Sequence, residues 1–451
     1  MIHLVLPALL VGAPSNPAPD SVVAFVNVSV ISMNREQVLT GQTVVVRGAR
    51  IAAMGPADQV KLPAGSNRIE GQGKFLMPGL AEMHAHIPGG NQPDSIVERV
   101  LFLYVSRGVT TVRGMLGHPK HLALREQAAS GRILSPTIYT SGPSLNGNSV
   151  PDAATAARLV TEQKAAGYDF LKIHPGIPRQ AFDTLAGTAQ RQRIPFAGHV
   201  PLDVGLSRAL QARYATIDHL DGYVEALTGP GRLTAAQSEF FGLNLGEQLD
   251  ESRLPALVQA TRDAGVWNVP TEVLMENLAP SVTIESLERR PEMRYVLPET
   301  RASWAKEKNS ILTEIGASRE SVERVMQLRR KLLKALHAGG AGLLLGSDAP
   351  QIYNVPGFSV HRELESLVAA GLTPYQALET GTRNVAVFFG TLPQTGTIEV
   401  GKRADLILLD ANPLTDIRNT AKQSGVMVRG RWLPRREIES RLATIASAMG
   451  N

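Results

Sequence analysis

The sequence predicts an α/β protein in which a (β/α)8 TIM barrel over residues 78–389 carries a small discontinuous β-sandwich domain built from both chain ends. Three observations predict it. Short β-rich runs alternate with helical segments through the middle of the chain, as in a barrel of parallel strands. Hairpin-like β runs fill residues 21–77, and the same pattern returns over 390–451. Because a few short strands are marginal alone, the two ends are expected to pair.

Eight apolar or β-branched runs supply the predicted barrel strands, at 80–86, 110–113, 137–141, 169–174, 194–199, 216–219, 267–270 and 343–348. Helical segments such as 153–166, which Gly167 ends, and 181–191 separate them. The last units contain long helical insertions at 225–265 and 280–338 that offer surfaces for a homo-oligomer. In such a barrel the chemistry is expected at the C-terminal strand ends.

The two chain termini carry no predicted chemistry. Residues 1–20 resemble an export signal, with Val11-Gly12-Ala13 as the cleavage candidate. This favours a periplasmic or secreted protein. No Lys or Arg precedes the apolar run, so a cytoplasmic protein with an N-terminal leader is the alternative. At the other end, residues 435–449 predict a closing amphipathic helix.

Composition excludes several function classes. The chain has 451 residues and a net charge of +5, too small a surplus for a nucleic-acid footprint. It has no cysteine, so any metal must be held by nitrogen and oxygen ligands. No apolar run reaches the length of a membrane span. The basic run Arg329-Arg330-Lys331, with Lys334, predicts a solvated helix face.

The first predicted strand ends in Met83-His84-Ala85-His86-Ile87. Side chains alternate along a strand, so His84 and His86 should point to the same side and form a two-imidazole claw for a metal. A His-x-His motif alone has a high false-positive risk, so the other strand ends must supply further ligands.

Those ligands are present at later strand ends. Lys172 lies in the fourth predicted strand, His199 ends the fifth, His219 ends the sixth and Asp348 ends the eighth. Each has an ordinary structural reading, such as a core histidine or a turn former. Six ligand-type residues at strand ends of one barrel together predict a metal site.

The chain resembles members of the amidohydrolase superfamily, in its imidazolonepropionase-like and prolidase-like group. The motifs that carry this resemblance are "LMPGLAEMHAHI", "RGVTTVRG", "AGHVP", "IDHLDG", "LGSDAP", "AGLTPYQALETGTRNVAVFFG" and "GTIEVGKRADLILLDANPL". The resemblance implies two divalent metals. His84, His86 and Asp348 would hold one, His199 and His219 would hold the second, and Lys172, carboxylated on its amine, would bridge them.

Physical chemistry supports the modified lysine. Burial lowers the pKa of a lysine and frees its amine to react with carbon dioxide, and two cations stabilise the resulting carbamate anion. Nitrogen and carboxylate oxygen ligands suit Zn²⁺ best, with Mn²⁺, Co²⁺ and Fe²⁺ as alternatives. The implied enzyme is a hydrolase of a carbon–nitrogen bond in a small-molecule substrate, in dipeptides or N-acyl amino acids, with Asp348 as the proton shuttle.

Four further residues are candidates for contacts with the substrate. Tyr223 could stabilise an oxyanion or pack in its loop. His174 shares the face of Lys172 if the strand continues. Arg113, after the second strand, could bind a substrate carboxylate or make a structural ion pair, and His361 could lie near the barrel mouth.

Three other functions stay open. A cyclic-amide hydrolase of the imidazolonepropionase or dihydroorotase kind would share the ligands. A one-metal deaminase would need a Glu three residues after His199, where this chain has Leu202. A catalytically inactive scaffold would have lost ligands. Metal content separates the classes, with two, one or no equivalents expected for the hydrolase, deaminase and scaffold.

Overall fold

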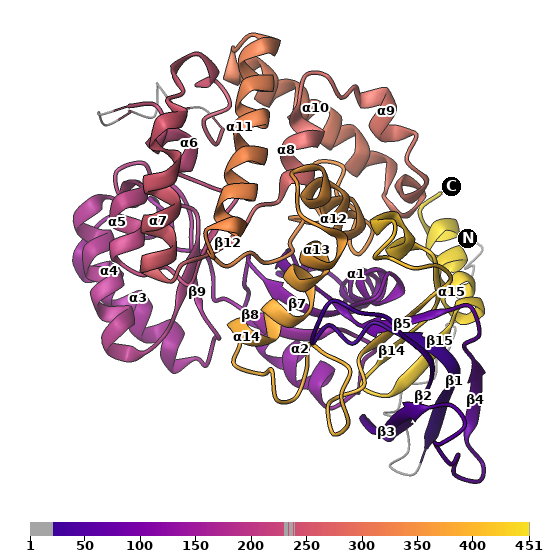
Figure 1. Cartoon of the computed structure of the whole chain (residues 1–451). Helices are drawn as coiled ribbons and strands as arrows, with labels where there is room; N and C mark the ends of the chain where they lie inside the picture. The colour runs from indigo at the N-terminus through magenta and orange to yellow at the C-terminus, as the bar shows by residue number, and fades with distance from the viewer. Residues whose placement is uncertain (1–20, 230–232, 234–237, 239, 451) are drawn as a thin grey trace, which may run out of the picture.

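The structure is a computed structural model that describes residues 21–229, 233, 238 and 240–450 (Figure 1). The predicted export signal lies outside the described residues and stays a prediction. Within the described ranges, every helix is too short or too polar to cross a membrane.

As predicted, both chain ends contribute to one separate β domain, and its described strands form a single hydrogen-bonded sheet. Its strands run in the order β15-β14-β13-β5-β1-β2-β3, and β4 pairs with β1. Strand β5 joins the two ends, because it pairs parallel to β1 and antiparallel to β13. The bounds of these strands are β1 Val22–Val30, β2 Leu39–Arg47, β3 Arg50–Pro56, β4 Asn67–Glu70, β5 Phe75–Pro78, β13 Leu406–Leu409, β14 Gln423–Val428 and β15 Arg431–Pro434. In Figure 1 the indigo and yellow strands of this sheet lie side by side.

The barrel segment contains seven of the eight predicted strands. They are β6 Leu80–Ala85, β7 Val109–Gly114, β8 Thr137–Thr140, β9 Leu171–Ile173, β10 Phe196–Gly198, β11 Thr216–Asp218 and β12 Trp267–Val269. All neighbours pair in parallel, in the groups β6-β7-β8 and β12-β11-β10-β9. Parallel bridges Ser141–Phe170 and Leu145–Ile173 connect the two groups.

The eighth predicted strand, 343–348, is irregular. It bridges Asn268 through Leu343 and Ala85 through Ala349, and so lies between β12 and β6. Two features interrupt a regular ladder. The Leu345 N–H donates to the carbonyl of Thr380 at 3.0 Å, and Asp348 has a left-handed backbone with φ 62°. Such a conformation is costly for a residue other than glycine and is typical of functional sites.

Helices surround the strands and also form an additional group beside α11 and α12 (Figure 1). The helices that the sequence predicted at 153–166 and 181–191 are present. The α-helices are α1 Asp94–Ser106, α2 Lys120–Ala129, α3 Ala153–Ala165, α4 Arg179–Gln192, α5 Gly205–Gln211, α6 Tyr223–Ala226, α7 Leu254–Ala264, α8 Glu272–Leu278, α9 Ile284–Glu288, α10 Pro298–Ile315, α11 Arg319–Ala338, α12 Ser359–Ala369, α13 Pro374–Gly381, α14 Arg383–Phe388 and α15 Arg435–Ala448. Four short 3-10 helices are η1 Gly246–Gln248, η2 Glu251–Arg253, η3 Pro291–Tyr295 and η4 Ile417–Ala421.

The basic run on α11 corrects one prediction. Arg329 is fully buried, not solvated. Its guanidinium donates to the carbonyl of His219 at 2.7 Å, to the carbonyl of Pro270 at 3.1 Å and to Glu272 at 2.5 Å. A buried guanidinium needs such partners to offset its lost hydration. The sequence pattern misled because a helix that packs on a barrel has one inward face, and Arg329 lies on it.

Candidate metal centre

The histidine pair of β6 converges with Asp348. The His86 Nε2 atom lies 2.8 Å from Asp348 Oδ1, and the His84 Nε2 atom lies 3.4 Å from the same oxygen. One ligand atom from each of the three residues falls within 4.8 Å of the others. The strand therefore places the two imidazoles as the alternation predicted, and the left-handed turn at Asp348 brings its carboxylate over them.

The other predicted ligands join this cluster. The Lys172 Nζ atom on β9 lies 3.5 Å from His84 Nε2. His219, which follows β11, has its ring centroid 4.5 Å from that of His84 and 4.7 Å from that of His199. Its Nε2 atom lies 3.9 Å from Asp348 Oδ2. The structure thus assembles all six residues from five barrel segments that are far apart in the sequence.

The contacts within the cluster fit a metal site. Asp348 Oδ1 is buried and makes no hydrogen bond within the described part of the chain, although two imidazole nitrogens lie close to it. Short distances without a hydrogen bond are expected when ligand atoms point toward one shared position. Such atoms do not point along hydrogen-bond directions to one another. An unsatisfied buried carboxylate oxygen is costly, and a cation would compensate it.

Protonation also suits metal binding. Burial holds the pKa values of His84 and His219 well below the ordinary histidine value, and lowers that of His199 to about 3. The three imidazoles are therefore neutral, the form that coordinates a metal. Burial, partly opposed by Asp218 and Asp348, lowers the pKa of Lys172 to about 8. A larger fraction of its amine is then neutral than for an exposed lysine.

A second ring of side chains orients these ligands, and the sequence interpretation missed it. Asp218 Oδ2 lies 3.0 Å from His84 Nδ1, and Asp221 Oδ2 lies 3.2 Å from His199 Nδ1. Metal-binding histidines commonly contact a carboxylate through their second nitrogen. The available signal was "TIDHLDG", in which acidic residues stand one before and two after His219. The third histidine, His219, contacts the hydroxyl of Thr271 through Nδ1 at 2.8 Å.

Glu82 is another residue that the sequence interpretation did not single out. Its buried carboxylate accepts hydrogen bonds from the backbone N–H of His84 at 3.0 Å and of Ser347 at 2.8 Å, and from the Ser347 hydroxyl at 2.5 Å. Burial raises its pKa to about 8. The hydrogen bonds of Glu82 connect β6 to the segment that carries Asp348.

The four candidate substrate contacts lie in different places. His174 stays beside the cluster, with its ring centroid 4.9 Å from that of His199. Arg113 is buried and engaged by Met83 O at 2.7 Å, Thr216 at 2.9 Å and Asp218 at 3.1 Å, so the structure shows the ion-pair alternative. The Tyr223 hydroxyl contacts Thr261 at 2.8 Å within the core.

His361 is not brought to the cluster. Its ring is buried on α12 with Nδ1 2.9 Å from the Thr420 hydroxyl and Nε2 3.1 Å from the carbonyl of Arg107. Both ring nitrogens are used by structural partners. Arg113, Tyr223 and His361 are thus held by structural partners. Of the four candidates, His174 is the one that lies beside the predicted ligands.

A cavity of about 1170 Å³ adjoins the part of the cluster that contains His199. His199 and Asp221 form part of its wall, together with residues of the loops after β9, β10 and β11. These loops lie at the C-terminal ends of the strands, where barrels bind substrates. A ligand held there would contact His199, the one predicted metal ligand among the described residues of the wall.

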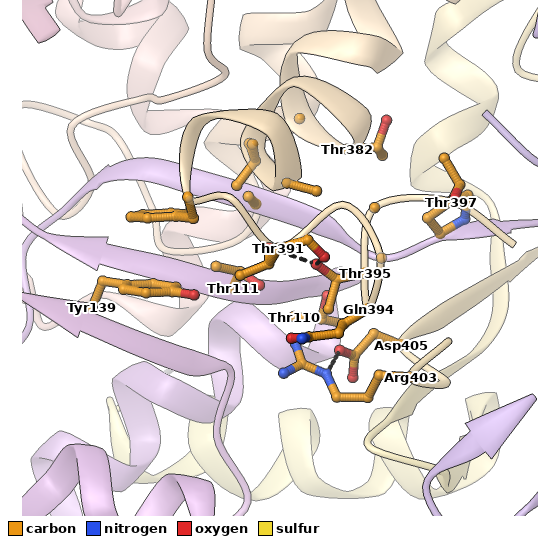
Figure 2. A pocket seen from close by; sticks show the side chains of 18 of the residues that line it. Thr110, Thr111, Tyr139, Thr382, Thr391, Gln394, Thr395, Thr397, Arg403 and Asp405 are labelled. Carbon is orange, nitrogen blue, oxygen red and sulfur yellow. Dashed lines mark hydrogen bonds and ion pairs between the residues drawn. The ribbon is translucent and has the colours of Figure 1, made fainter. Parts of the chain in front are cut away.

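A smaller cavity, of about 270 Å³, lies at the opposite ends of the strands (Figure 2). Thr110 and Thr111 at the start of β7 line it, with Tyr139 and the ion-paired Arg403 and Asp405. Figure 2 shows hydroxyl groups and this ion pair around the space. None of the six predicted ligands lines this cavity, so the candidate chemistry belongs to the other end of the barrel.

Comparison with known proteins places the chain in the Amidohydrolase family, whose profile matches residues 75–433. The chain belongs to this family. The sequence is 24% identical to adenine deaminase 2 of Bradyrhizobium sp. (strain ORS 278) over 428 residues, which are 91% of this chain and 58% of that protein. The chain thus spans little more than half the length of that curated relative.

Two solved structures show the same fold. Bottromycin amidohydrolase superposes with a TM-score of 0.71 at 23% identity and covers 95% of this chain and 91% of its own. A Xaa-Pro dipeptidase with methionine bound in its active site superposes with a TM-score of 0.66 at 18% identity, over 92% of this chain and all of its own. At these identities the likeness establishes the architecture, a barrel with a separate sheet from the chain ends.

Proposed function

We propose that the protein is a binuclear metal-dependent hydrolase that cleaves an amide bond, in dipeptides or N-acyl amino acids. The observation that carries this proposal is the convergence of two ligand sets on one side of the barrel. His84, His86 and Asp348 would hold one divalent metal. His199 and His219, with ring centroids 4.7 Å apart, would hold the other. When bound, such metals lower the pKa of a water molecule and polarise a substrate carbonyl.

Lys172 would join the two halves. Its neutral amine attacks carbon dioxide and loses a proton, which leaves a carbamate anion on Nζ. The atom lies 3.5 Å from His84 Nε2 in the buried centre. An uncompensated ammonium is unfavourable at this depth, whereas an anion between two cations is not.

Asp348 would move the proton. Its Oδ1 and Oδ2 atoms face both ligand pairs, at 2.8 Å from His86 and 3.9 Å from His219. A carboxylate in this position can accept a proton from the attacking water and donate it to the nitrogen of the departing amine, since amides need protonation of the leaving group. Replacing Asp348 would therefore reduce turnover more than metal content.

His174 is proposed as a residue that contacts the substrate. Burial lowers the pKa of its imidazole to about 2, so the ring is neutral near pH 7. A neutral imidazole with one N–H can donate a hydrogen bond to a carbonyl oxygen beside the metals. We infer that it helps to stabilise the charge that develops on this oxygen.

The similarity to an adenine deaminase makes deamination the second candidate. Leu202 stands three residues after His199, where the deaminase hypothesis required a glutamate, and it lines the large cavity. An apolar side chain cannot transfer a proton. We therefore favour hydrolysis of linear amides, with cyclic amides as the nearer alternative.

A substrate panel tests this proposal. Zinc-reconstituted protein is assayed with dipeptides, N-acyl amino acids, hydantoins, dihydroorotate and adenine, with loss of substrate and formation of product followed by liquid chromatography and mass spectrometry. We expect turnover of linear amides, which Lys172→Ala and Asp348→Asn reduce by at least about a hundredfold, in the range of lost catalytic groups. Exclusive turnover of adenine or of cyclic amides would contradict the proposal.

A further inference from the structure

The cavity beside His199 has a mostly apolar wall. Ile177 follows β9, Leu202 and Leu206 follow β10, and Phe240 and Phe241 are the aromatic members of the wall. The Phe241 ring centroid lies 4.9 Å from that of His219 and 5.7 Å from that of His199. Apolar surface therefore begins immediately at the ligands of the proposed second metal, and any substrate group next to the scissile bond on this side must contact it.

The size of the cavity exceeds what a small acyl group needs. Its volume of about 1170 Å³ lies above the usual range for small-molecule sites, roughly 300–1,000 Å³. An acetyl group would leave most of this apolar wall in contact with water. A longer acyl chain would bury it, and each buried methylene favours binding by the hydrophobic effect.

The charges around the cavity decide which end of the substrate enters. Asp221 and Glu225 line it, and Glu225 Oε1 accepts a hydrogen bond from Ser238 at 2.7 Å. Arg179 also lines it, but pairs with Asp183 at 3.1 Å. Among the described lining residues, no unpaired cation is available for a carboxylate. The described part of the wall therefore favours an uncharged group over the carboxylate of an amino-acid product.

We infer that this cavity is the acyl site and that it selects uncharged, apolar acyl groups of medium length, from about hexanoyl upward, over acetyl and over acyl groups that end in a carboxylate. The inference rests on the proposed amide hydrolysis and names its substrate class. The inference predicts that binding strengthens as the acyl chain becomes longer, because each added methylene would contact the apolar wall.

The test uses the metal-loaded full chain and a series of N-acyl-L-methionines with acetyl, butanoyl, hexanoyl and adipoyl groups. Hexanoyl and adipoyl have six carbons each and differ by a terminal carboxylate. We expect kcat/KM to rise by about two- to fourfold per methylene, so at least about 16-fold from acetyl to hexanoyl. Adipoyl should react at least about tenfold more slowly than hexanoyl, because its carboxylate would be desolvated without a cation.

A filled cavity supplies the second arm. Leu202→Trp adds bulk to the wall, and should lower the hexanoyl-to-acetyl ratio at least about fivefold. Leu116→Trp is the matched control, because Leu116 is 43% exposed and lies outside the cavity. It should leave the ratio as in the wild type. An equal ratio in Leu202→Trp and Leu116→Trp, when both are folded by circular dichroism, would place the acyl chain elsewhere.

The two proposals fail in different ways. If the wild type cleaves no member of the series and no dipeptide, the proposed hydrolysis of linear amides is wrong. If it cleaves acetyl-methionine as well as hexanoyl-methionine, or adipoyl-methionine as well as hexanoyl-methionine, hydrolysis stands and the acyl-site inference is overturned.

Discussion

Asp218 lies between His84 and Arg113. Its Oδ2 is 3.0 Å from His84 Nδ1, and its carboxylate accepts from the Arg113 guanidinium at 3.1 Å and 3.3 Å. The three residues come from β11, β6 and β7, so one carboxylate joins three barrel strands beneath the proposed metals. Arg113 keeps the pKa of Asp218 below its usual value despite burial, and the anion in turn fixes the orientation of the His84 imidazole.

Loss of this carboxylate should weaken metal binding. Asp218→Asn removes the anion that orients His84, and changes in such supporting residues typically cost about 10–100-fold in metal affinity. We expect this loss for the site of His84, His86 and Asp348, measured by competition with a chelator. Asp183→Asn is the control, because the Asp183 side chain is 42% exposed and pairs with Arg179 and Arg208, neither of which is a predicted metal ligand. Equal metal affinities in the two variants would show that Asp218 does not support metal binding.

Arg329 should contribute strongly to stability. Arg329→Met leaves Glu272 buried without its 2.5 Å partner, and breaking a buried pair on one side costs about 3–5 kcal/mol. Arg330→Met should cost less than about 1 kcal/mol, since Arg330 is 45% exposed and lies 3.6 Å from Glu276. Urea unfolding of the two variants measures the difference. Similar losses of unfolding free energy in the two variants would show that the burial of Arg329 does not determine its contribution to stability.

Tyr223 offers a test between a catalytic and a packing role. Its hydroxyl lies 2.8 Å from the Thr261 hydroxyl, and Tyr223→Phe should lower the free energy of unfolding by about 1 kcal/mol through loss of this hydrogen bond. We expect kcat to change less than about twofold. A hundredfold drop in kcat at unchanged stability would instead assign Tyr223 to the oxyanion.

His361 should make stability depend on pH. Burial lowers its pKa to about 3, whereas an unfolded histidine titrates near about 6.5. Between these values the unfolded chain binds more protons, so the contribution of His361 is full above pH 6.5 and is lost as the pH falls toward 3. The slope is about 1.4 kcal/mol per pH unit at its steepest.

Comparison with His361→Gln isolates this contribution. Urea unfolding of the metal-free proteins at pH 5, 6, 7 and 8 should show a shallower acid-side slope in the variant, while the slopes above pH 7 agree. Identical slopes at pH 5 would show that His361 titrates normally in the folded protein.

The sequence predicted the barrel, the pairing of the chain ends and the residues that gather at the site, because side-chain alternation and the direction of parallel strands follow from local patterns. It did not predict what depends on tertiary contacts. The irregular segment before Asp348 follows from the Leu345–Thr380 bond, and the burial of Arg329 follows from how α11 packs. Asp218 and Asp221 stand one residue before and two residues after the recognised ligand His219, but their partners His84 and His199 come from distant parts of the chain.

The most direct test of the binuclear centre is metal content, measured by mass spectrometry on protein that has been loaded with Zn²⁺ and passed through a desalting column. The account predicts about two equivalents for the wild type and about one for His199→Ala combined with His219→Ala, since His84, His86 and Asp348 remain. It also predicts fewer than two for Lys172→Ala. One equivalent or none in the wild type, or two retained in Lys172→Ala with full activity, would contradict it.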